Sequence, residues 1–289
     1  MTPTFRFAPS PNGRLHLGHA LSAITGFEMA RKVGGRFLVR IEDIDTVRSK
    51  PELIAAIFDD LHWLGLKWEE PVLRQSEDFS VYRAAADRLQ AMGLLYPCFA
   101  TRTEIAAALP SGHQFDPDGA PIYPGIHKTL SPAEVQLRQS RGEPSAMRID
   151  MARAMLQAQQ MPRSAALSFT AIDDDWRETK VIADPARWGD AVIVRKDTPA
   201  SYHLACVADD ARQGVTHVTR GLDLLASTDI HVLLQVLLEL PQPLYHHHRL
   251  LTDLQGRKLA KSAGDTSLAS LRAQGATPQE IRRLIQLSD

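Results

Sequence analysis

Two histidines flank a glycine at the start of a predicted helix, directly after a turn rich in proline. The stretch reads Ala8-Pro9-Ser10-Pro11-Asn12-Gly13-Arg14-Leu15-His16-Leu17-Gly18-His19. Residues three apart lie on the same face of a helix, so His16 and His19 can act together. A helix N-terminus attracts phosphate groups, and Gly18 lets a nucleotide approach the backbone closely. The histidines could therefore donate hydrogen bonds to phosphate oxygens whose charge builds up as pyrophosphate leaves.

A second candidate site is a basic loop late in the chain. It reads Gly256-Arg257-Lys258-Leu259-Ala260-Lys261-Ser262. Lys258 and Lys261 could close over a triphosphate and stabilise the leaving pyrophosphate. Each motif alone has an ordinary alternative, because surface histidines and paired surface lysines are common. The occurrence of both in this order favours an ATP-binding site.

The segments around the histidines predict the fold that positions them. A strand at 5–8, a helix from about 17 to 32 and a strand at 36–42 form a strand–helix–strand unit. Such a unit is typical of a parallel, doubly wound α/β sheet. Further helices are predicted at 51–64, 78–92, 228–239 and 277–287, and further strands at 191–195, 202–207, 215–219 and 246–248.

Prolines interrupt the middle of the chain, at Pro97, Pro110, Pro117, Pro121, Pro124, Pro132 and Pro144. This pattern favours an inserted α+β subdomain over core sheet. We therefore expect the first half of the catalytic domain at 1–95, the insertion at 96–190 and the second half at 191–245. Residues 246–289 would hold the basic loop and a short helical C-terminal extension.

Composition sets weaker limits. The formal net charge is −1, so overall charge does not indicate a nucleic-acid binder. Residues 249–283 carry seven Lys/Arg against three acids, a local excess of +4 that also fits a solvated helical face. The only cysteines, Cys98 and Cys206, form no disulfide framework. With no signal peptide and no apolar run of membrane-spanning length, we expect a cytoplasmic protein.

These stretches together resemble a known family. HLGH is similar to the HIGH signature of class I aminoacyl-tRNA synthetases, and KLAKS is similar to their KMSKS signature. FRFAPSPNGRLHLGH, LVRIEDID and SYHLACVADDARQGVTHVTRGLDLL resemble the glutamyl and glutaminyl branch. The resemblance implies a Rossmann-type catalytic domain that activates glutamate with ATP and Mg²⁺ and transfers it to tRNA.

The resemblance also implies a role for each matching residue. The glutamate site would comprise Arg6, Ala8, Ser10, Glu42, Tyr202 and Arg220. Within it, Glu42 would receive the α-amino group and Arg220 would pair with a carboxylate. The ATP site would comprise Pro9, His16, Gly18, His19 and Lys261. The groups implied in catalysis are His16, His19, Lys258 and Lys261.

The RNA substrate is predicted from the short C-terminal part. Only 27 residues follow Ser262, so we expect no anticodon-binding domain. This is similar to the glutamyl-queuosine tRNA(Asp) synthetases, which esterify glutamate to the cyclopentenediol of queuosine in the anticodon loop. The implied partners are glutamate, ATP and tRNA(Asp) bearing queuosine, bound by a monomer. A truncated glutamyl-tRNA synthetase, a non-catalytic paralogue that binds glutamate or RNA, and a nucleotidyltransferase of the same fold remain open.

The predicted insertion departs from the family's zinc pattern, which is Cys-x-Cys followed by Tyr-x3-Cys. Here Cys98-Phe99-Ala100 lacks one thiolate, and Tyr123-Pro124-Gly125-Ile126-His127 ends in histidine. Structural zinc needs four ligands, so the three that remain argue against zinc. The run His246-His247-His248 would alternate faces along a strand and cannot converge on a metal. We expect these residues in a strand near the ATP pocket.

Overall fold

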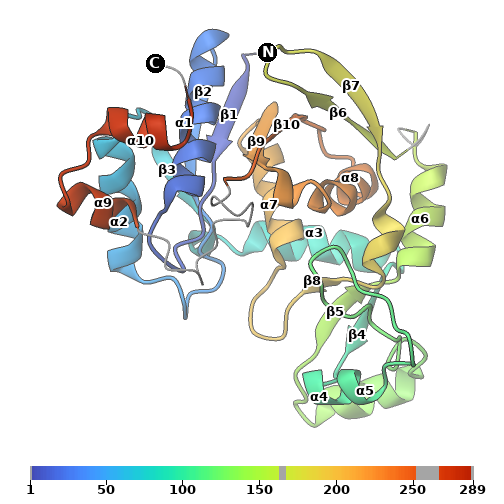
Figure 1. Ribbon diagram of the computed structural model, residues 1–289. Helices are drawn as coiled ribbons and strands as arrows, with labels where there is room; N and C mark the ends of the chain where they lie inside the picture. Colours follow the sequence, from blue (N-terminus) through green and yellow to red (C-terminus); the bar gives the residue numbers. More distant parts are fainter. Residues whose placement is uncertain (1, 163–166, 252–266, 288–289) are drawn as a thin grey trace.

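Figure 1 shows the computed structural model, which describes residues 2–162, 167–251 and 267–287. Its larger part is built on a seven-stranded sheet with the order β3-β2-β1-β9-β10-β6-β7. All neighbours pair in parallel except β6 and β7. The strands are β1 (Thr4–Phe7), β2 (Arg36–Ile41), β3 (Glu69–Arg74), β6 (Ser168–Ile172), β7 (Glu178–Ile182), β9 (His217–Gly221) and β10 (Leu244–His248). The chain reverses its winding direction between β1 and β9, so the predicted doubly wound α/β fold is confirmed.

Helices cover both faces of this sheet. One group contains α1 (Leu17–Lys32), α2 (Pro51–Trp63), α9 (Leu268–Ala273) and α10 (Pro278–Leu284). Within it, α9 packs on α2 and α10 packs on α1, as Figure 1 shows. A second group contains α3 (Ser80–Ala91), α6 (Met151–Gln160), α7 (Tyr202–Arg212) and α8 (Ser227–Leu237), in which α7 packs on both α3 and α8.

The two faces of strands β1 and β2 differ in chemistry. Phe5 and Phe7 of β1 belong to the apolar core shared with α1. Arg6 of β1 and Arg40 of β2 instead pair with Asp210 on α7. Successive side chains of a strand point to opposite faces, so the α1 face is apolar and the α7 face carries buried charge.

A small three-stranded antiparallel sheet forms a separate lobe, at the bottom of Figure 1. It has the order β4-β5-β8, with β4 (Leu95–Cys98), β5 (Ala146–Ile149) and β8 (Val192–Val194). Two short helices accompany it, α4 (Arg102–Ala107) and α5 (Pro132–Ser140). A capping box begins α5, since Ser131 accepts from the Glu134 amide and Glu134 accepts from that of Ser131.

One strand prediction was wrong, and another predicted strand lies in the smaller sheet. Residues 202–207 form the first turns of helix α7, whose N-cap Ser201 accepts a hydrogen bond from the Leu204 amide. All residues from Leu204 to Asp210 are buried, so no polar face reveals the helical period. The strand predicted at 191–195 exists as β8, but it pairs with β5 in the small sheet.

Two strands from the range expected as an insertion, β6 and β7, join the large sheet. Part of the expected insertion, 96–190, thus contributes strands to the large sheet, so the chain passes between the two sheets more often than the expected boundaries at 96, 190 and 245 imply. Those boundaries stay a prediction.

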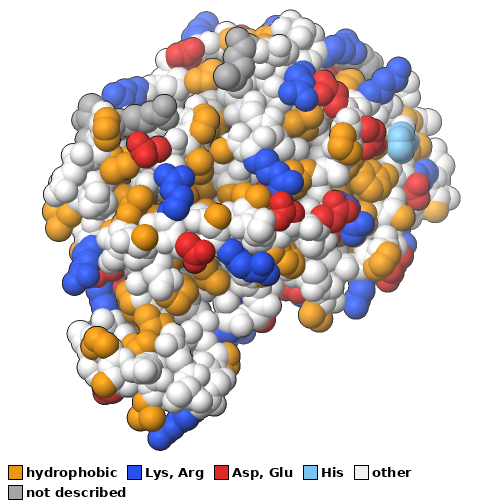
Figure 2. All heavy atoms as spheres, turned by 180° about the vertical axis from the view of Figure 1, so that it is seen from behind, with side chains coloured by type: hydrophobic (Ala, Val, Ile, Leu, Met, Phe, Trp, Pro, Cys, Tyr) orange, Lys and Arg blue, Asp and Glu red, His pale blue; other side chains and the backbone are white. Residues whose placement is uncertain are grey.

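Three arginines of the basic C-terminal stretch that the structure describes contact groups within the chain. Arg272 pairs with Asp60, Arg282 pairs with Glu28, and Arg249 donates to the carbonyl of Ile285. On the face shown in Figure 2, Lys and Arg side chains are interspersed with Asp and Glu. Within the described ranges, no helix is both long enough and apolar enough to cross a membrane.

Candidate functional site

A cavity of about 520 Å³ opens at the carboxyl ends of β1, β2, β9 and β10, beside the N-terminus of α1. This is the point where the strand order reverses, the usual ligand site of a doubly wound sheet. All ten predicted site residues within the described ranges line it: Arg6, Ala8, Pro9, Ser10, His16, Gly18, His19, Glu42, Tyr202 and Arg220. Lys258 and Lys261 lie outside the described residues.

The two histidines of the HLGH stretch form a reciprocal cap on α1. His16 is the N-cap, and its Nδ1 accepts from the Gly18 amide at 3.1 Å. His19 Nδ1 accepts from the His16 amide at 3.2 Å, and the two rings lie 3.9 Å apart. An accepting Nδ1 places the proton of a neutral imidazole on Nε2. Each ring can therefore present an N–H donor while its other nitrogen caps the helix.

Gly18 serves the same arrangement. A Cβ atom at this position would lie 3.0 Å from Cε1 of His16. That distance is tighter than most Cβ contacts, so a larger residue would push the His16 ring by a few tenths of an ångström. Glycine thus leaves room for the observed His16 ring position, in addition to the predicted close approach of a nucleotide.

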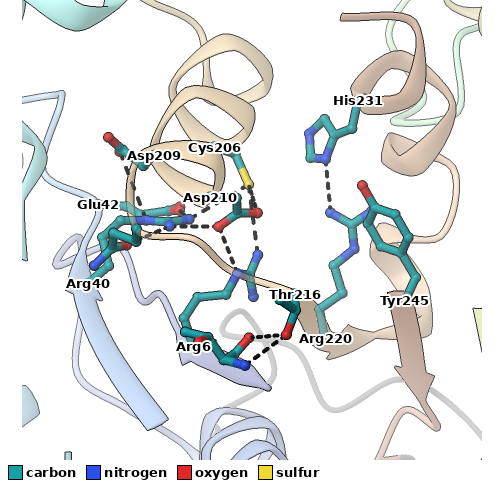
Figure 3. Close-up of polar contacts among 12 residues, drawn as sticks. Arg6, Arg40, Glu42, Cys206, Asp209, Asp210, Thr216, Arg220, His231 and Tyr245 are labelled. Carbon is teal, nitrogen blue, oxygen red and sulfur yellow. Dashed lines mark hydrogen bonds and ion pairs between the residues drawn. The ribbon is translucent and has the colours of Figure 1, made fainter. Parts of the chain in front are cut away.

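A buried ion network lies behind one wall of the cavity and contributes Arg6 and Glu42 to its lining (Figure 3). Oδ1 of Asp210 accepts from Nε of Arg6 at 3.0 Å and from Nη1 of Arg40 at 2.7 Å. Nη2 of Arg40 also donates to Oε1 of Glu42 at 3.0 Å. Burial opposes ionisation of Asp210, but the two guanidinium groups outweigh it and lower its pKa to about 2. Asp210 therefore stays charged and fixes the arginines.

Glu42 is the anionic group of this wall that faces the cavity. Burial raises its pKa above the ordinary value, and the charges of Arg40 and Arg6 only partly offset this effect. An ammonium group arriving in the cavity would stabilise the carboxylate and lower that pKa. Glu42 is thus suited to bind a cationic group.

Arg220 provides the opposite charge at the end of β9. It is 4% exposed, and the ion pairs among the described residues include none to its guanidinium. Its neighbours are neutral: Thr228, His231, His247 and the ring of Tyr245, whose centroid lies 5.3 Å from Cζ. A buried cation whose described neighbours are uncharged favours a carboxylate ligand. With Glu42, it makes the cavity complementary to a free amino acid that bears an extra carboxylate.

Comparison with known proteins agrees with this geometry. The family described as tRNA synthetases class I (E and Q), catalytic domain, matches residues 4–288. The chain belongs to this family. It is therefore a ligase acting on tRNA, and class I synthetases use an amino acid, ATP and Mg²⁺.

Several relatives resemble this synthetase along its length. A glutamyl-Q tRNA(Asp) synthetase of Rhodobacter capsulatus is 46% identical over 292 residues, which cover 98% of this chain and 99% of that protein. One from Symbiobacterium thermophilum is 40% identical, covering 96% of this chain and 83% of that protein. A glutamate–tRNA ligase of Prochlorococcus marinus is 36% identical, but the match covers 98% of this chain and only 57% of the relative.

Solved structures agree on the fold. The glutamate-tRNA synthetase of Elizabethkingia anophelis superposes with a TM-score of 0.77 at 24% identity, covering 100% of this chain and 66% of that one. A methionyl-tRNA synthetase of Mycobacterium tuberculosis in complex with methionyl-adenylate superposes with a TM-score of 0.60 at 13% identity, covering 99% and 64%. The synthetase therefore has the class I catalytic fold throughout the described residues.

Sequence reasoning missed several residues that shape the cavity. Asp210 and Arg40 hold the ion network, while Asp223 and Arg249 line the cavity. The sequence feature that could have indicated them is an arginine among the apolar residues of each of two predicted strands, Arg6 in the first and Arg40 in the second. A buried arginine requires an acid, and the adjacent acids at 209 and 210 were the candidates.

The residues of the altered zinc pattern lie together but bond to one another. Cys98 Sγ donates to Tyr123 Oη at 3.3 Å. Nδ1 of His127 accepts from the amides of Phe99 and Ala100 at 3.1 and 3.0 Å. Among the described residues, no three His, Cys, Asp or Glu side chains gather as metal ligands.

The three consecutive histidines lie on β10 and bond to different elements. Nε2 of His246 lies 2.9 Å from Asp174, and Nε2 of His248 lies 2.6 Å from Oγ of Ser22. His247 points instead to Arg220. His248 lines the cavity, as expected for a strand beside the predicted ATP pocket.

Proposed function

We propose that this synthetase activates glutamate with ATP and transfers it to queuosine in the anticodon loop of tRNA(Asp). The observation that carries the amino-acid assignment is that Glu42 and Arg220 line the same cavity, and that the described partners of Arg220 are all neutral. The observation that carries the acceptor is the 46% identity to a glutamyl-Q tRNA(Asp) synthetase over nearly the whole of both chains.

Glutamate would bind across the cavity. Its ammonium group would lie at Glu42, and Arg220 with Tyr202 would hold a carboxylate. Arg6 already donates from Nε to Asp210 and from Nη2 to Sγ of Cys206, so its remaining N–H groups would contact the substrate beside Ala8 and Ser10. The fixed network behind the wall would hold these groups in place before the substrate arrives.

The nucleotide would bind at the start of α1. The triphosphate would lie against the Nε2–H groups of His16 and His19, with the base beside Pro9 and Gly18. Lys258 and Lys261 would approach the phosphates from the other side. Mg²⁺ would accompany ATP and neutralise part of its charge.

Two displacements would follow. A carboxylate oxygen of glutamate attacks the α-phosphorus of ATP, the bond to the β-phosphate oxygen breaks, and pyrophosphate leaves. A ring hydroxyl of queuosine then attacks the acyl carbon of glutamyl-adenylate, loses its proton, and AMP leaves. Histidine donors directed at the phosphates would stabilise the charge of the first step.

The first test is ATP–pyrophosphate exchange driven by glutamate with no tRNA present. We expect exchange with glutamate and little with glutamine or aspartate. A wild-type protein that binds ATP yet catalyses no exchange would be a non-catalytic paralogue, and the proposal would fail.

The second test compares tRNA(Asp) carrying queuosine with the same tRNA lacking it. We expect transfer only to the modified form. Equal charging of both, or charging of tRNA(Glu), would favour the alternative that glutamate is attached to the terminal ribose. That alternative is favoured by the relatives named glutamate–tRNA ligase, at 36–38% identity. Periodate cannot separate the two, since it destroys the diol of queuosine and of the terminal ribose alike.

A further inference from the structure

The guanidinium of Arg220 is surrounded on its inner side by neutral acceptors. Its Nη2 donates to Oγ1 of Thr228 at 2.6 Å. Its Nη1 lies 3.3 Å from Nδ1 of His231, and its Nε donates to Nε2 of His247 at 3.3 Å. A guanidinium has five N–H donors. These contacts use one on each nitrogen, so one N–H on each terminal nitrogen is left over, the number that a carboxylate needs for two hydrogen bonds.

The contacts determine the proton positions on both rings. Arginine has no acceptor atom, so each imidazole nitrogen that faces it must be unprotonated. His231 therefore accepts at Nδ1 and carries its proton on Nε2, which lies 3.3 Å from Nδ1 of His203. His247 accepts at Nε2 and carries its proton on Nδ1. The two neighbours of Arg220 are thus opposite tautomers, and neither is an imidazolium.

We propose that His231 and His247 are positioning residues that determine specificity for an acidic substrate. They occupy the inner N–H groups of Arg220 without neutralising it, so its charge is retained for the substrate carboxylate. An acid at either position would pair with Arg220 and remove the preference for glutamate over glutamine. This inference rests on the proposed function for the identity of that carboxylate.

Burial and the surrounding groups keep the rings neutral. His231 is 1% exposed, and its ring lies against Arg220 of β9 (Figure 3). Tyr202 and His203 of α7 face the same ring. Burial and then the charge of Arg220 lower the pKa of His231 well below its ordinary value. The same two causes lower the pKa of His247 to about 3. Both rings therefore stay neutral at physiological pH.

Matched variants separate charge from shape. In His231→Asn, the side-chain oxygen replaces the accepting Nδ1, and His231→Asp has the same shape with a negative charge. His247→Gln and His247→Glu form the equivalent pair for the accepting Nε2. We expect the Asp and Glu variants to raise KM for glutamate about tenfold or more, the size of a lost charged hydrogen bond, and to change kcat less. They should also narrow the discrimination between glutamate and glutamine about tenfold. The Asn and Gln variants should recover KM to within about threefold of wild type.

Equal impairment of the two members of each pair would overturn the inference, since it would indicate a packing role alone. The wild-type protein offers a readout that does not depend on activity or on variant folding. Long-range ¹⁵N NMR of the imidazole rings should show the Nε2–H tautomer for His231 and the Nδ1–H tautomer for His247. The other tautomer, or an imidazolium at pH 7, would refute the inference even if glutamate is activated. Correct tautomers with no glutamate-driven exchange would instead refute the proposed function.

Discussion

Arg6 and Arg40, from neighbouring strands, share one oxygen of Asp210, with donor–acceptor distances of 3.0 and 2.7 Å. Asp210 lies on α7, so one carboxylate ties β1 and β2 to the helix that also supplies Tyr202. The same Arg40 holds Glu42. The cavity-lining Glu42 and Arg6 are therefore positioned by one buried network, which couples the stability of the fold to the geometry of the site.

Replacing Asp210 with asparagine should be strongly destabilising. Both arginines would keep their charge in a buried place with one compensating carboxylate fewer, and breaking a buried ion pair in this way costs about 3–5 kcal/mol. Urea unfolding monitored by circular dichroism would measure the loss. Glu69→Gln is a suitable control, because it breaks the half-exposed Arg36–Glu69 pair, a type of pair that contributes at most about 1 kcal/mol. Similar losses in both variants would show that the Asp210 network contributes little.

The same network predicts how stability depends on pH. The pKa of Asp210 is lowered from 3.8 to about 2 in the folded protein, so the unfolded state binds the proton more readily. Its contribution is complete above about pH 4 and is lost as the pH falls toward 2. The wild type should therefore lose more stability than Asp210→Asn across that interval. Parallel pH curves for the two proteins would contradict the assigned pKa.

Glutamate binding should weaken in mild acid because of Glu42. Burial raises the pKa of this carboxyl above 4.5, with Arg40, Arg6 and Asp210 as its charged neighbours. The ionised form is the one that binds an ammonium group, so KM for glutamate should rise as the pH falls, beginning above pH 4.5. Exchange assays across this range would measure the rise. Glu42→Gln should have a high KM that no longer depends on pH, and a variant with wild-type pH dependence would exclude Glu42 as the ammonium ligand.

The two histidines of α1 can be tested by variants that separate capping from catalysis. Asparagine at His16 or His19 can replace the accepting Nδ1 and preserve the helix cap, but it lacks a donor at the position of Nε2. We expect each variant to lower kcat for exchange by about 10²–10³, the cost of one lost oxyanion donor. Its free energy of unfolding should change by less than about 1 kcal/mol.

Glutamine at the same positions provides the contrast. Its amide can reach the position of Nε2 but leaves the amides of His16 and Gly18 without their cap. The glutamine variants should therefore have a higher kcat for exchange than the asparagine variants, but a lower free energy of unfolding. Asparagine variants that unfold as readily as the glutamine variants would show that capping does not depend on Nδ1.

Much of the fold and the cavity could be predicted from local sequence. Pro9, Gly13 and the histidines indicated a turn between a strand and a helix, and the strand–helix–strand unit that follows predicted a parallel, doubly wound sheet. Every predicted site residue in the described ranges lines one cavity, because the carboxyl ends of adjacent parallel strands meet at one edge of the sheet.

What could not be predicted depends on contacts between distant segments. The pattern at 202–207 predicted a strand where α7 begins, because a short apolar run buried on all sides has no periodic polar face. Asp210, the partner of Arg6, lies 204 residues further along the chain. Of the partners of Arg220, His231 lies 11 residues away and His247 comes from another strand. No spacing rule relates these positions. Specificity in this protein therefore depends on tertiary neighbours such as His231, which carry no local motif.

The small lobe should fold without zinc. Cys98, Tyr123 and His127 already satisfy one another and two backbone amides, and the position of a second thiolate is taken by Ala100. Elemental analysis of the purified protein should show far less than one zinc per chain, and a chelator should leave the melting temperature unchanged. The double variant Ala100→Cys and His127→Cys would complete a set of three thiolates and one tyrosine, and it should bind zinc and lose stability on chelation. Stoichiometric zinc in the unaltered protein, or a lower melting temperature after chelation, would show that His127 serves as a ligand and that the hydrogen bonds of this lobe rearrange around the metal.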